Sequence, residues 1–442
     1  MRDIALTLIF AVLAWGTILQ PWIGIITLSW FSYMNPHRLA YGFAHLFPFV
    51  AIAAGLTMFS WLMSREKKPF PWSREVFLEI LFILWFTITT ITALNTNVTP
   101  QGTTVAWDYW DRAFKVQIEI FMTLLILRTR FQLEALVWTI VISIGFYGIK
   151  GGLWALLTGG HHRVYGPPQS FIEDNNTLAV ALVMTIPLMR YLQVRAQRKL
   201  VRWGLAAAQV LTVLATLATY SRGGLLAIGV VGVALLMKSR HKIWFALAIV
   251  LVALPLYKFM PAEWKERMRT LQTTDQDELD KSAKGRLNAW AFAINLAKDR
   301  PLVGGGFRVF ISPEFAKYAP DPADRHDAHS IYFEVLGEHG FPGLALFLLM
   351  GISTWFTANR VVRKAKKIPE LAWAADLVRM VQVALAGFAT GGAFAGLAFF
   401  DLPYHLMAIV ILCKVLVEEE VRRARRQALA MASTAAPEEV AV

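Results

Sequence analysis

The sequence predicts an all-α polytopic membrane protein with about twelve transmembrane helices and one large loop on the outer side of the membrane. Apolar residues make up 56% of the chain and charged residues 17%, a composition typical of membrane proteins. Apolar runs approaching the roughly 20 residues that a helix needs to cross the hydrocarbon core recur along the chain. Residues 259–329 differ, because they hold eleven Lys/Arg and eleven Asp/Glu. A charged loop of this size is expected to carry the function.

The first apolar segment, residues 4–33, is interrupted at Gln20 and Pro21. It allows one kinked crossing or two short, tilted half-spans. The number of spans that follow favours one crossing, with the N-terminus on the cytoplasmic side. No small-residue cleavage site follows the segment, which predicts a retained anchor and not a removed signal peptide.

Eleven further apolar segments complete the predicted set, and they suggest three regions. Residues 1–158 hold the N-terminal membrane helices, and residues 159–426 form a second membrane domain that includes the outer loop 259–341. The Ala-rich tail 427–442 is expected to be disordered. A single cysteine, Cys413, cannot form an intrachain disulfide and is expected to pack in the last span. The predicted spans are 43–63, 76–94, 110–127, 132–149, 174–190, 200–219, 223–237, 243–258, 342–358, 374–398 and 402–417.

The net charge of +13 is concentrated in short loops between the spans. Because basic loops remain on the cytoplasmic side, these segments and the C-terminus are predicted to be cytoplasmic. This placement accounts for the charge without nucleic acid as a partner. The basic segments are 65–74, 128–130, 190–202, 238–242, 360–367 and 422–426, and alternation puts 95–109, 150–173, 220–222, 259–341 and 399–401 outside.

The outer loop is predicted to contain two helices separated by a turn. The first covers 283–298 with apolar residues at helical spacing, and Gly304 to Gly306 form a tight turn. The second begins near His329 and stops at Gly337 or Gly340, and Pro342 begins the next span. The inward residues are expected to be Leu287, Trp290, Ala291, Ile294 and Ala297 in the first helix, and Ile331, Tyr332, Val335 and Leu336 in the second.

Two arginines of the outer face are candidates for binding an anion. Arg222 stands in the sequence YSRGG between two apolar spans, where flanking glycines permit a phosphate to approach closely. The alternative is an arginine that extends to the membrane interface. Arg286 lies near the start of the predicted loop helix, where backbone N–H groups also favour anions. Its alternative is an exposed helix arginine.

His329 is the candidate base, because histidine titrates near neutrality and can take a proton from a hydroxyl. A structural histidine is the alternative. His326 and Asp327 lie close by and would permit a metal site, but this spacing is common by chance. Glu338 and His339 are expected to shape the turn before the next span.

A second outer loop, 159–176, is rich in turn formers and polar residues. Arg163, Asp174 and Asn176 are candidates for lining a substrate cavity, although N-capping of span 174–190 is a sufficient alternative for Asp174 and Asn176. Gly305 and its neighbours either present N–H groups to an anion or only form a turn. Asp401 and His405, between the last two spans, are weaker candidates.

Several catalytic motifs are absent from the sequence. It has no P-loop, no G-x-S-x-G elbow and no H-E-x-x-H metal motif. A transporter, the rival from another class, would place functional ionisable residues at mid-span. Few charges lie within the predicted spans; Asp376 and Arg379 are near a helix end.

Four segments together resemble the O-antigen ligase/polymerase superfamily. Residues 166–188 resemble its glycine-to-asparagine segment, and 220–224 resemble its S-R-G motif. Residues 285–307 resemble its large periplasmic loop, and 329–340 resemble the H-N-x-Y/L…E-x-G signature that closes the loop. The order and topology agree over roughly 160–400.

The N-terminal part narrows the resemblance to one branch. Residues 32–38, 171–176 and 328–333 are similar to the putative O-glycosylation ligases associated with exosortase systems. The chain departs from the wider superfamily at Ser330, where Asn is usual. His329 is retained, so the departure affects the hydrogen bonding beside it and not the base itself.

The resemblance implies a polytopic glycosyltransferase of the C type in the bacterial inner membrane, with its active site facing the periplasm. The donor would be a glycan on undecaprenyl diphosphate, transferred with inversion and without metal or other cofactor. His329 would deprotonate the acceptor hydroxyl, and Arg222 and Arg286 would bind the diphosphate. The acceptor would be a protein Ser/Thr hydroxyl or, in a polymerase, a growing polysaccharide end; lipid A core fits this branch less well. The residues expected to bind substrate are Arg163, Asp174, Asn176, Gly305, Tyr332 and Glu338.

Overall fold

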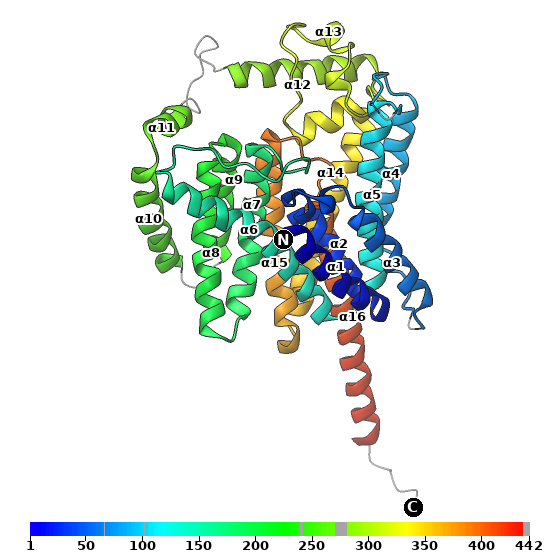
Figure 1. Ribbon diagram of the computed structural model, residues 1–442. Coiled ribbons are helices and arrows are strands. Elements are labelled where there is room, and N and C mark those ends of the chain that lie inside the picture. Colours follow the sequence, from blue (N-terminus) through cyan, green and yellow to red (C-terminus); the bar gives the residue numbers. More distant parts are fainter. Residues whose placement is uncertain (66, 101, 239–241, 270–280, 436–442) are drawn as a thin grey trace, which may run out of the picture.

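The computed structural model describes residues 1–65, 67–100, 102–238, 242–269 and 281–435. Within these ranges the chain is helical, and its only β-pairing is a single bridge between Val98 and Thr104. Long helices form a bundle, and α12 and α13 of the charged loop cover one end of it (Figure 1). The last helix projects from the opposite end. The fold is therefore all-α, as predicted.

The order of the long helices follows the apolar segments of the sequence. Among the described residues, six helices are long and apolar enough to cross a membrane, which indicates a multi-pass membrane protein. In the described part of the charged loop lie three further α-helices, α11 Ala262–Arg269, α12 Lys281–Asp299 and α13 Phe315–Tyr318. The long helices are α1 Arg2–Leu19, α2 Pro21–Met34, α3 Phe49–Met63, α4 Arg74–Ile91, α5 Val105–Ile126, α6 Arg130–Leu157, α7 Asn175–Arg195, α8 Lys199–Ala218, α9 Arg222–Lys238, α10 Lys242–Phe259, α14 Ile331–Ala365, α15 Ala372–Gly391 and α16 Asp401–Ala435.

The first apolar segment forms a hairpin of α1 and α2 and not one kinked crossing. Gln20 has an extended backbone (φ −144°, ψ 110°), and Pro21 starts α2 at a position where its missing N–H is harmless. At the start of α1, the Asp3 carboxylate accepts from the N–H groups of Gly42 and Ala44, just beyond α2. The N-terminus therefore lies at the end of the bundle opposite to loop 65–74. The prediction that it lies on the same side as that loop is wrong.

The segments predicted to be outside meet at one end of the bundle. The Leu94 N–H donates to Gly305 O at 2.8 Å, and the Val164 N–H donates to Ala218 O at 3.0 Å. The basic segments meet at the other end, where Lys364 Nζ lies 2.9 Å from Glu418 Oε1. Charge in the sequence therefore grouped the loops correctly, apart from Ser239 to His241 and 270–280, which lie outside the described residues.

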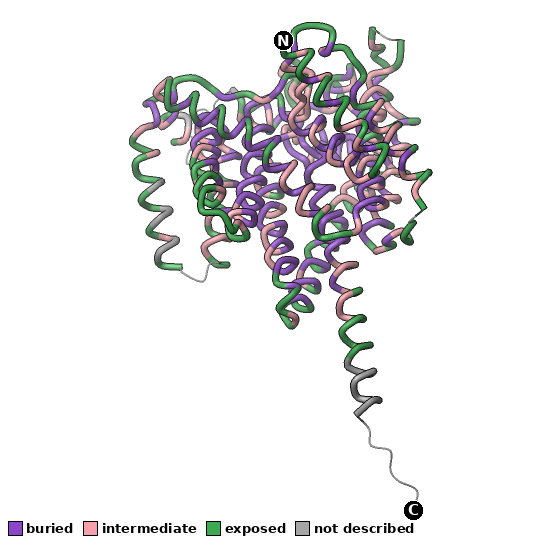
Figure 2. The backbone as a smooth tube through the Cα atoms, turned by 60° about the horizontal axis from the view of Figure 1, so that its bottom comes forward, coloured by how far each residue is buried: buried purple, intermediate pink, exposed green. Residues whose placement is uncertain are grey.

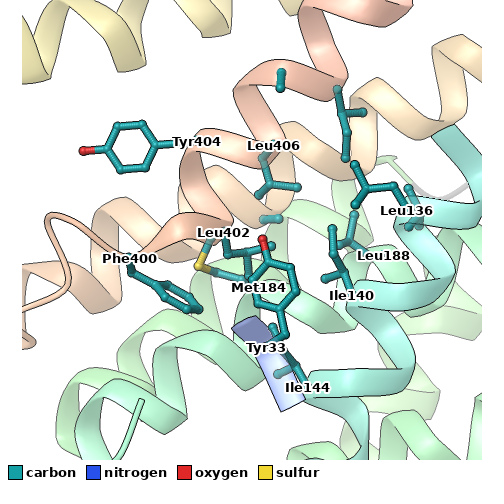
Figure 3. Packing of buried hydrophobic residues seen from close by; sticks show 14 of the residues in the cluster. Tyr33, Leu136, Ile140, Ile144, Met184, Leu188, Phe400, Leu402, Tyr404 and Leu406 are labelled. Carbon is teal, nitrogen blue, oxygen red and sulfur yellow. The ribbon is translucent and has the colours of Figure 1, made fainter. Parts of the chain in front are cut away.

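The central part of the core lies between α6, α7 and α16, with Tyr33 of α2 packed among them (Figure 3), and buried residues of most other long helices continue it. Figure 2 shows the buried backbone running through the middle of the bundle. Helices α6 and α8 approach closely, because a Cβ at Gly152 would lie only 2.3 Å from the carbonyl oxygen of Leu211. Small residues permit such close helix contacts where lipid gives little drive for association.

Several predicted boundaries differ from the structure, and three of them change how a segment is understood. Helix α6 extends to Leu157, past the predicted end at 149, and α16 extends to Ala435, into the tail expected to be disordered. Residues 436–442 lie outside the described residues. Helix α15 ends at Gly391, and the predicted span 374–398 continues as a short 3₁₀ turn and a buried extended segment before Asp401. An apolar sequence alone does not distinguish buried irregular backbone from helix.

The loop helix α12 buries a face that agrees only in part with the one predicted. Ala297 is fully buried, as predicted. Leu287 is 49% exposed and Ile294 38% exposed, whereas Phe292 and Leu296 are fully buried. Phe292 stacks on Phe315 of α13, with ring centroids 4.7 Å apart. Apolar residues occur on several sides of α12, so the residue spacing was compatible with burial of either of two helix faces. Packing against α13 and α14 selects one of them.

Candidate functional site

A break in α14 positions the acidic residues that follow His329. Gly340 has φ +67°, and a Cβ there would lie 2.6 Å from Pro301 O, so only glycine fits. This confirms the predicted end of the second loop helix. The turn at 304–306 contacts α14 just before this break. The N–H groups of Gly305 and Gly306 donate to Gly337 O and Glu338 O at 2.9 and 2.8 Å.

These hydrogen bonds decide between the two interpretations of the glycine turn. The Gly305 N–H is buried and already bonded to the helix carbonyl. The interpretation in which Gly305 presents its N–H to an anion therefore does not agree with the structure. The turn instead fixes the outer loop to α14.

Replacing Gly306 by alanine is expected to loosen this attachment. Gly306 has φ +75°, and a Cβ there would lie 2.4 Å from the Cβ of Ala93. The left-handed backbone alone costs an L-residue about 1–2 kcal/mol, and the overlap adds to this. Thermal unfolding in detergent should show a lower midpoint for Gly306→Ala. Gly55→Ala, in a helix with no atom within 4 Å of the added Cβ, should not be destabilised.

A cavity of about 100 Å³ lies beside the first turns of α14. It collects residues from five separate parts of the chain, so it exists only in the folded protein. Three of the predicted site residues, His329, Asp174 and Glu338, line it together. The full lining is Tyr109, Asp174, Thr177, Arg308, Phe310, Asp327, Ala328, His329, Glu334, Glu338 and Gly396.

His329 has the properties of a base that is neutral near pH 7. It is half-buried and occupies the left-handed region, with φ +41°. Burial lowers its pKa below the ordinary value of 6.5, the positive charge of Arg286 lowers it further, and Asp327 and Asp174 partly oppose this. A neutral imidazole in a cavity can accept a proton from a bound hydroxyl.

Arg308 is a cavity residue that the sequence did not single out. Its backbone N–H donates to Glu338 Oε1 at 2.7 Å, and its guanidinium Nη1 lies 3.3 Å from Asp327 Oδ2. The guanidinium also lies over the ring of Tyr109, 5.5 Å from the centroid. Burial lowers the pKa of Arg308, but the surrounding acidic groups, led by Asp327, raise it overall. The one feature of the sequence that could have suggested Arg308 as a site residue is its place just after the glycine turn.

Asp174 caps α7 and at the same time faces the cavity. Its Oδ1 accepts from the Asn176 N–H at 2.7 Å, and its Oδ2 accepts from the Thr177 hydroxyl at 2.6 Å. Asp174 therefore does both of the things that the sequence left open. It caps α7, and it lines the cavity. Asn176 contributes its backbone to the cap and does not line the cavity.

Glu334 was also missed, although its spacing gave a clue. It lies one turn before Glu338 on α14, and both residues are buried. Its Oε2 accepts from the Ala398 N–H at 3.2 Å. Glu334 thus binds the extended segment after α15, whose backbone would otherwise lack this partner. Two acids four apart in a mostly apolar stretch mark one helix face.

Arg222 begins α9 in close contact with two other elements. A Cβ at Gly223 would lie 2.7 Å from the Cβ of Phe394, and one at Gly224 would lie 2.7 Å from the Cβ of Ala179. The ring of Phe394 in turn faces that of Trp290 on α12, with centroids 6.5 Å apart. The flanking glycines therefore allow α9 to approach α7 and the segment after α15.

Arg286 stands one turn before Trp290 on α12. The Trp290 indole N–H donates to Ala328 O at 2.8 Å, directly before His329. At the neighbouring position, a Cβ at Gly285 would lie 1.8 Å from the His326 ring. The α12 helix is thus held against the backbone of the candidate base. Arg222 and Arg286 themselves do not line the cavity.

The remaining candidates lie elsewhere. Arg163 is exposed, with its guanidinium 5.6 Å from the ring centroid of Tyr220. The Tyr332 hydroxyl donates to Ala389 O at 2.8 Å, and its side chain lines a separate groove. His405 bonds to Tyr33 of α2, with Nδ1 and the hydroxyl 2.7 Å apart, and Asp401 bonds to Ser32. These last two contacts join α16 to the N-terminal hairpin.

An apolar groove begins beside the cavity and follows α14. It encloses about 460 Å³ between α14, α15 and α16. Ile331 and Tyr332, the first residues of α14, form one end, and Trp355 and Phe356 lie further along the same helix. One helix therefore carries both the acidic cavity wall and the apolar groove.

The structure also bears on the metal alternative. Within the described ranges, no three His, Cys, Asp or Glu side chains are grouped so that they could hold a metal ion. His326 Nε2 lies 3.0 Å from Asp324 Oδ1. The Ser330 hydroxyl, at the position where the superfamily usually has Asn, is buried and makes no hydrogen bond to a described residue.

Comparison with known proteins places two family matches on the chain. Residues 178–348 match a family model described as O-antigen ligase. Residues 1–197 match a family described as one of unknown function. No curated protein matches the chain. The first match runs from the first turn of α7 through α8, α9, α10 and the charged loop into the first half of α14. It therefore includes Arg222, Arg286, Arg308 and His329.

Proposed function

We propose that this chain, a member of the O-antigen ligase/polymerase superfamily, transfers a glycan from undecaprenyl diphosphate to an acceptor hydroxyl. The superfamily implies ligase or polymerase chemistry on lipid-linked glycans. The finer proposal is a ligase that acts on protein Ser or Thr hydroxyls at the periplasmic face of the inner membrane, with the C-terminus in the cytoplasm. The observation that carries it is the half-buried His329, whose pKa is lowered by burial, in a cavity beside an apolar groove.

The proposed step exchanges one bond for another at the anomeric carbon. The acceptor oxygen forms a bond to that carbon, and the hydroxyl proton passes to His329. The bond from the carbon to the diphosphate oxygen breaks, and the diphosphate leaves with the electron pair. Attack from the face opposite the leaving group inverts the carbon. Arg222 and Arg286 would stabilise the charge that grows on the diphosphate, as a divalent cation does in other transferases.

The apolar groove is the proposed seat of the polyprenyl chain. It starts at Ile331 and Tyr332, directly after the candidate base, and continues along α14 past Met350. A chain lying there would keep its diphosphate end near the end of the bundle that holds His329. The groove therefore supports a lipid-linked donor over a nucleotide sugar.

The test is a transfer assay with purified protein, an undecaprenyl-diphosphate-linked glycan and EDTA. Peptides with a single Thr and polysaccharide fragments are offered as separate acceptors. Transfer to the peptide is the expected result. Extension of the polysaccharide alone would instead assign the polymerase reaction. Absence of both transfer and glycan release would contradict the proposal and favour a transporter.

The pH dependence of transfer should report the environment of His329. Because burial and Arg286 lower its pKa below 6.5, the acidic limb of the rate profile should have its midpoint below pH 6.5. Asp327→Asn removes a negative charge that raises this pKa, so the limb should move to lower pH. Initial rates between pH 4.5 and 8.5 would measure the shift, and movement towards higher pH would contradict the assignment.

A further inference from the structure

The cavity beside His329 carries an excess of negative charge. Four acidic side chains line it, those of Asp174, Asp327, Glu334 and Glu338, against one guanidinium and one imidazole. Counting only the two aspartates as charged, they still exceed the single guanidinium by one. Arg222 and Arg286, the residues proposed to bind diphosphate, are not part of its lining. The acidic groups of the proposed site therefore lie in the cavity, and the two arginines proposed to bind diphosphate lie outside it.

The arginine that lines the cavity, Arg308, already interacts with the acidic side chains around it. Arg308 lies 3.3 Å from Asp327 through Nη1 and donates its backbone N–H to Glu338 Oε1. Its guanidinium also lies against Tyr109. It thus offsets part of the negative charge and is held in place by three neighbours.

One carboxylate oxygen of the cavity lacks a hydrogen-bond donor. Glu338 is 2% exposed, and its Oε2 makes no hydrogen bond to a described residue; the nearest basic atom, His339 Nε2, is 3.8 Å away. A buried acceptor without a donor is unfavourable. A ligand that brings a hydroxyl or ammonium group would supply the donor.

The size of the cavity restricts which part of an acceptor can enter it. An apolar cavity of about 150 Å³ holds benzene, with six heavy atoms. The cavity here is smaller, about 100 Å³. It has room for the few heavy atoms of a Ser or Thr side chain, whereas a hexose ring would remain at its mouth.

We propose that this cavity is the acceptor site and selects Ser or Thr hydroxyls in neutral or basic protein segments, excluding acidic ones. The inference rests on the proposed glycan transfer and adds that the charge of the acceptor segment determines which hydroxyls are used. An anion entering the field of these acidic side chains is repelled, whereas a lysine near the hydroxyl is attracted. Arg308, Asp327 and Glu338 are then specificity-determining residues.

The experiment compares three synthetic peptides that differ only in the residues beside a single Thr, which are Lys, Gln or Asp. Transfer from undecaprenyl-diphosphate-linked glycan is measured at pH 8 and low salt, together with release of glycan to water. The Lys and Gln peptides should exceed the Asp peptide by about tenfold or more in kcat/KM. The difference should lie mainly in KM and shrink as salt is added.

Variants then test whether the cavity causes the selectivity. Asp327→Asn should reduce the preference for Lys over Asp, and Asp327→Glu should restore it. Asp324→Asn makes the same change in net charge outside the cavity, so the preference should persist. Thermal unfolding and glycan release to water identify variants that have lost the fold.

The outcomes separate this inference from the proposed function. Equal transfer to all three peptides would overturn the charge selectivity and leave the ligase standing. Glycan release or transfer to polysaccharide, with no peptide used, would overturn the protein acceptor. Inactivity towards every acceptor and towards water would remove the proposed function itself, and the inference with it.

Discussion

His329→Ala should lower glycan transfer by about 10²–10⁴-fold, the range that a positioned general base contributes. The variant removes the imidazole that lines the acidic cavity, and the arginines proposed to bind the donor remain. The loss should therefore appear in kcat, with little change in the KM for the lipid-linked donor. Initial rates at saturating donor and acceptor would measure it.

His326→Ala is the matched control for this prediction. His326 lies three residues earlier, pairs with Asp324 at 3.0 Å and does not line the cavity. It should retain most of the wild-type rate. An equal loss in both variants would indicate damage to the loop, and a His329→Ala enzyme with near wild-type kcat would require a different base.

Arg222→Ala and Arg286→Ala should each lower kcat by about 10²–10³-fold, as expected when one donor to a developing negative charge is removed. Lysine at either position should recover part of the loss, because it keeps the charge and loses the two-pronged hydrogen bonding of the guanidinium. The double variant should lose less than the product of the single losses, since both groups would act on one diphosphate.

Arg325→Ala is the control for the two arginines, because Arg325 is exposed on the same outer loop. It should leave kcat unchanged. A rise in KM with unchanged kcat for Arg222→Ala or Arg286→Ala would show uniform donor binding and contradict stabilisation of the leaving group. Measuring both constants for all variants with one donor preparation distinguishes these results.

The sequence predicted the helices and the grouping of loops well, because both depend on strong local properties. Apolar runs identify long helices, and the basic residues marked which loops share an end of the bundle. The hairpin of α1 and α2 was harder, since Gln20 and Pro21 suit either a kink or a reversal. The buried segment after Gly391 continues an apolar run, so hydropathy alone extended the helix too far.

The candidate site was only partly visible in the sequence, for a similar reason. His329, Asp174 and Glu338 could be selected by residue type and motif, and the structure places them around one cavity. Arg308 and Tyr109 gain their position from contacts between distant segments. The predicted buried face of α12 was partly wrong, because the helix is apolar on several sides and only tertiary packing selects Phe292 over Ile294.

The cavity is built across the boundary between the two family matches. Tyr109, whose ring packs against the guanidinium of Arg308, comes from the N-terminal region. Trp85 and Thr89 come from the same region and form hydrogen bonds to His339, the residue after Glu338. A chimera that joined residues 178–348 to a different N-terminal half would lose one wall of the site. The two regions should therefore be exchanged as a unit, and changes in the N-terminal half offer a route to altered acceptor choice without touching the base.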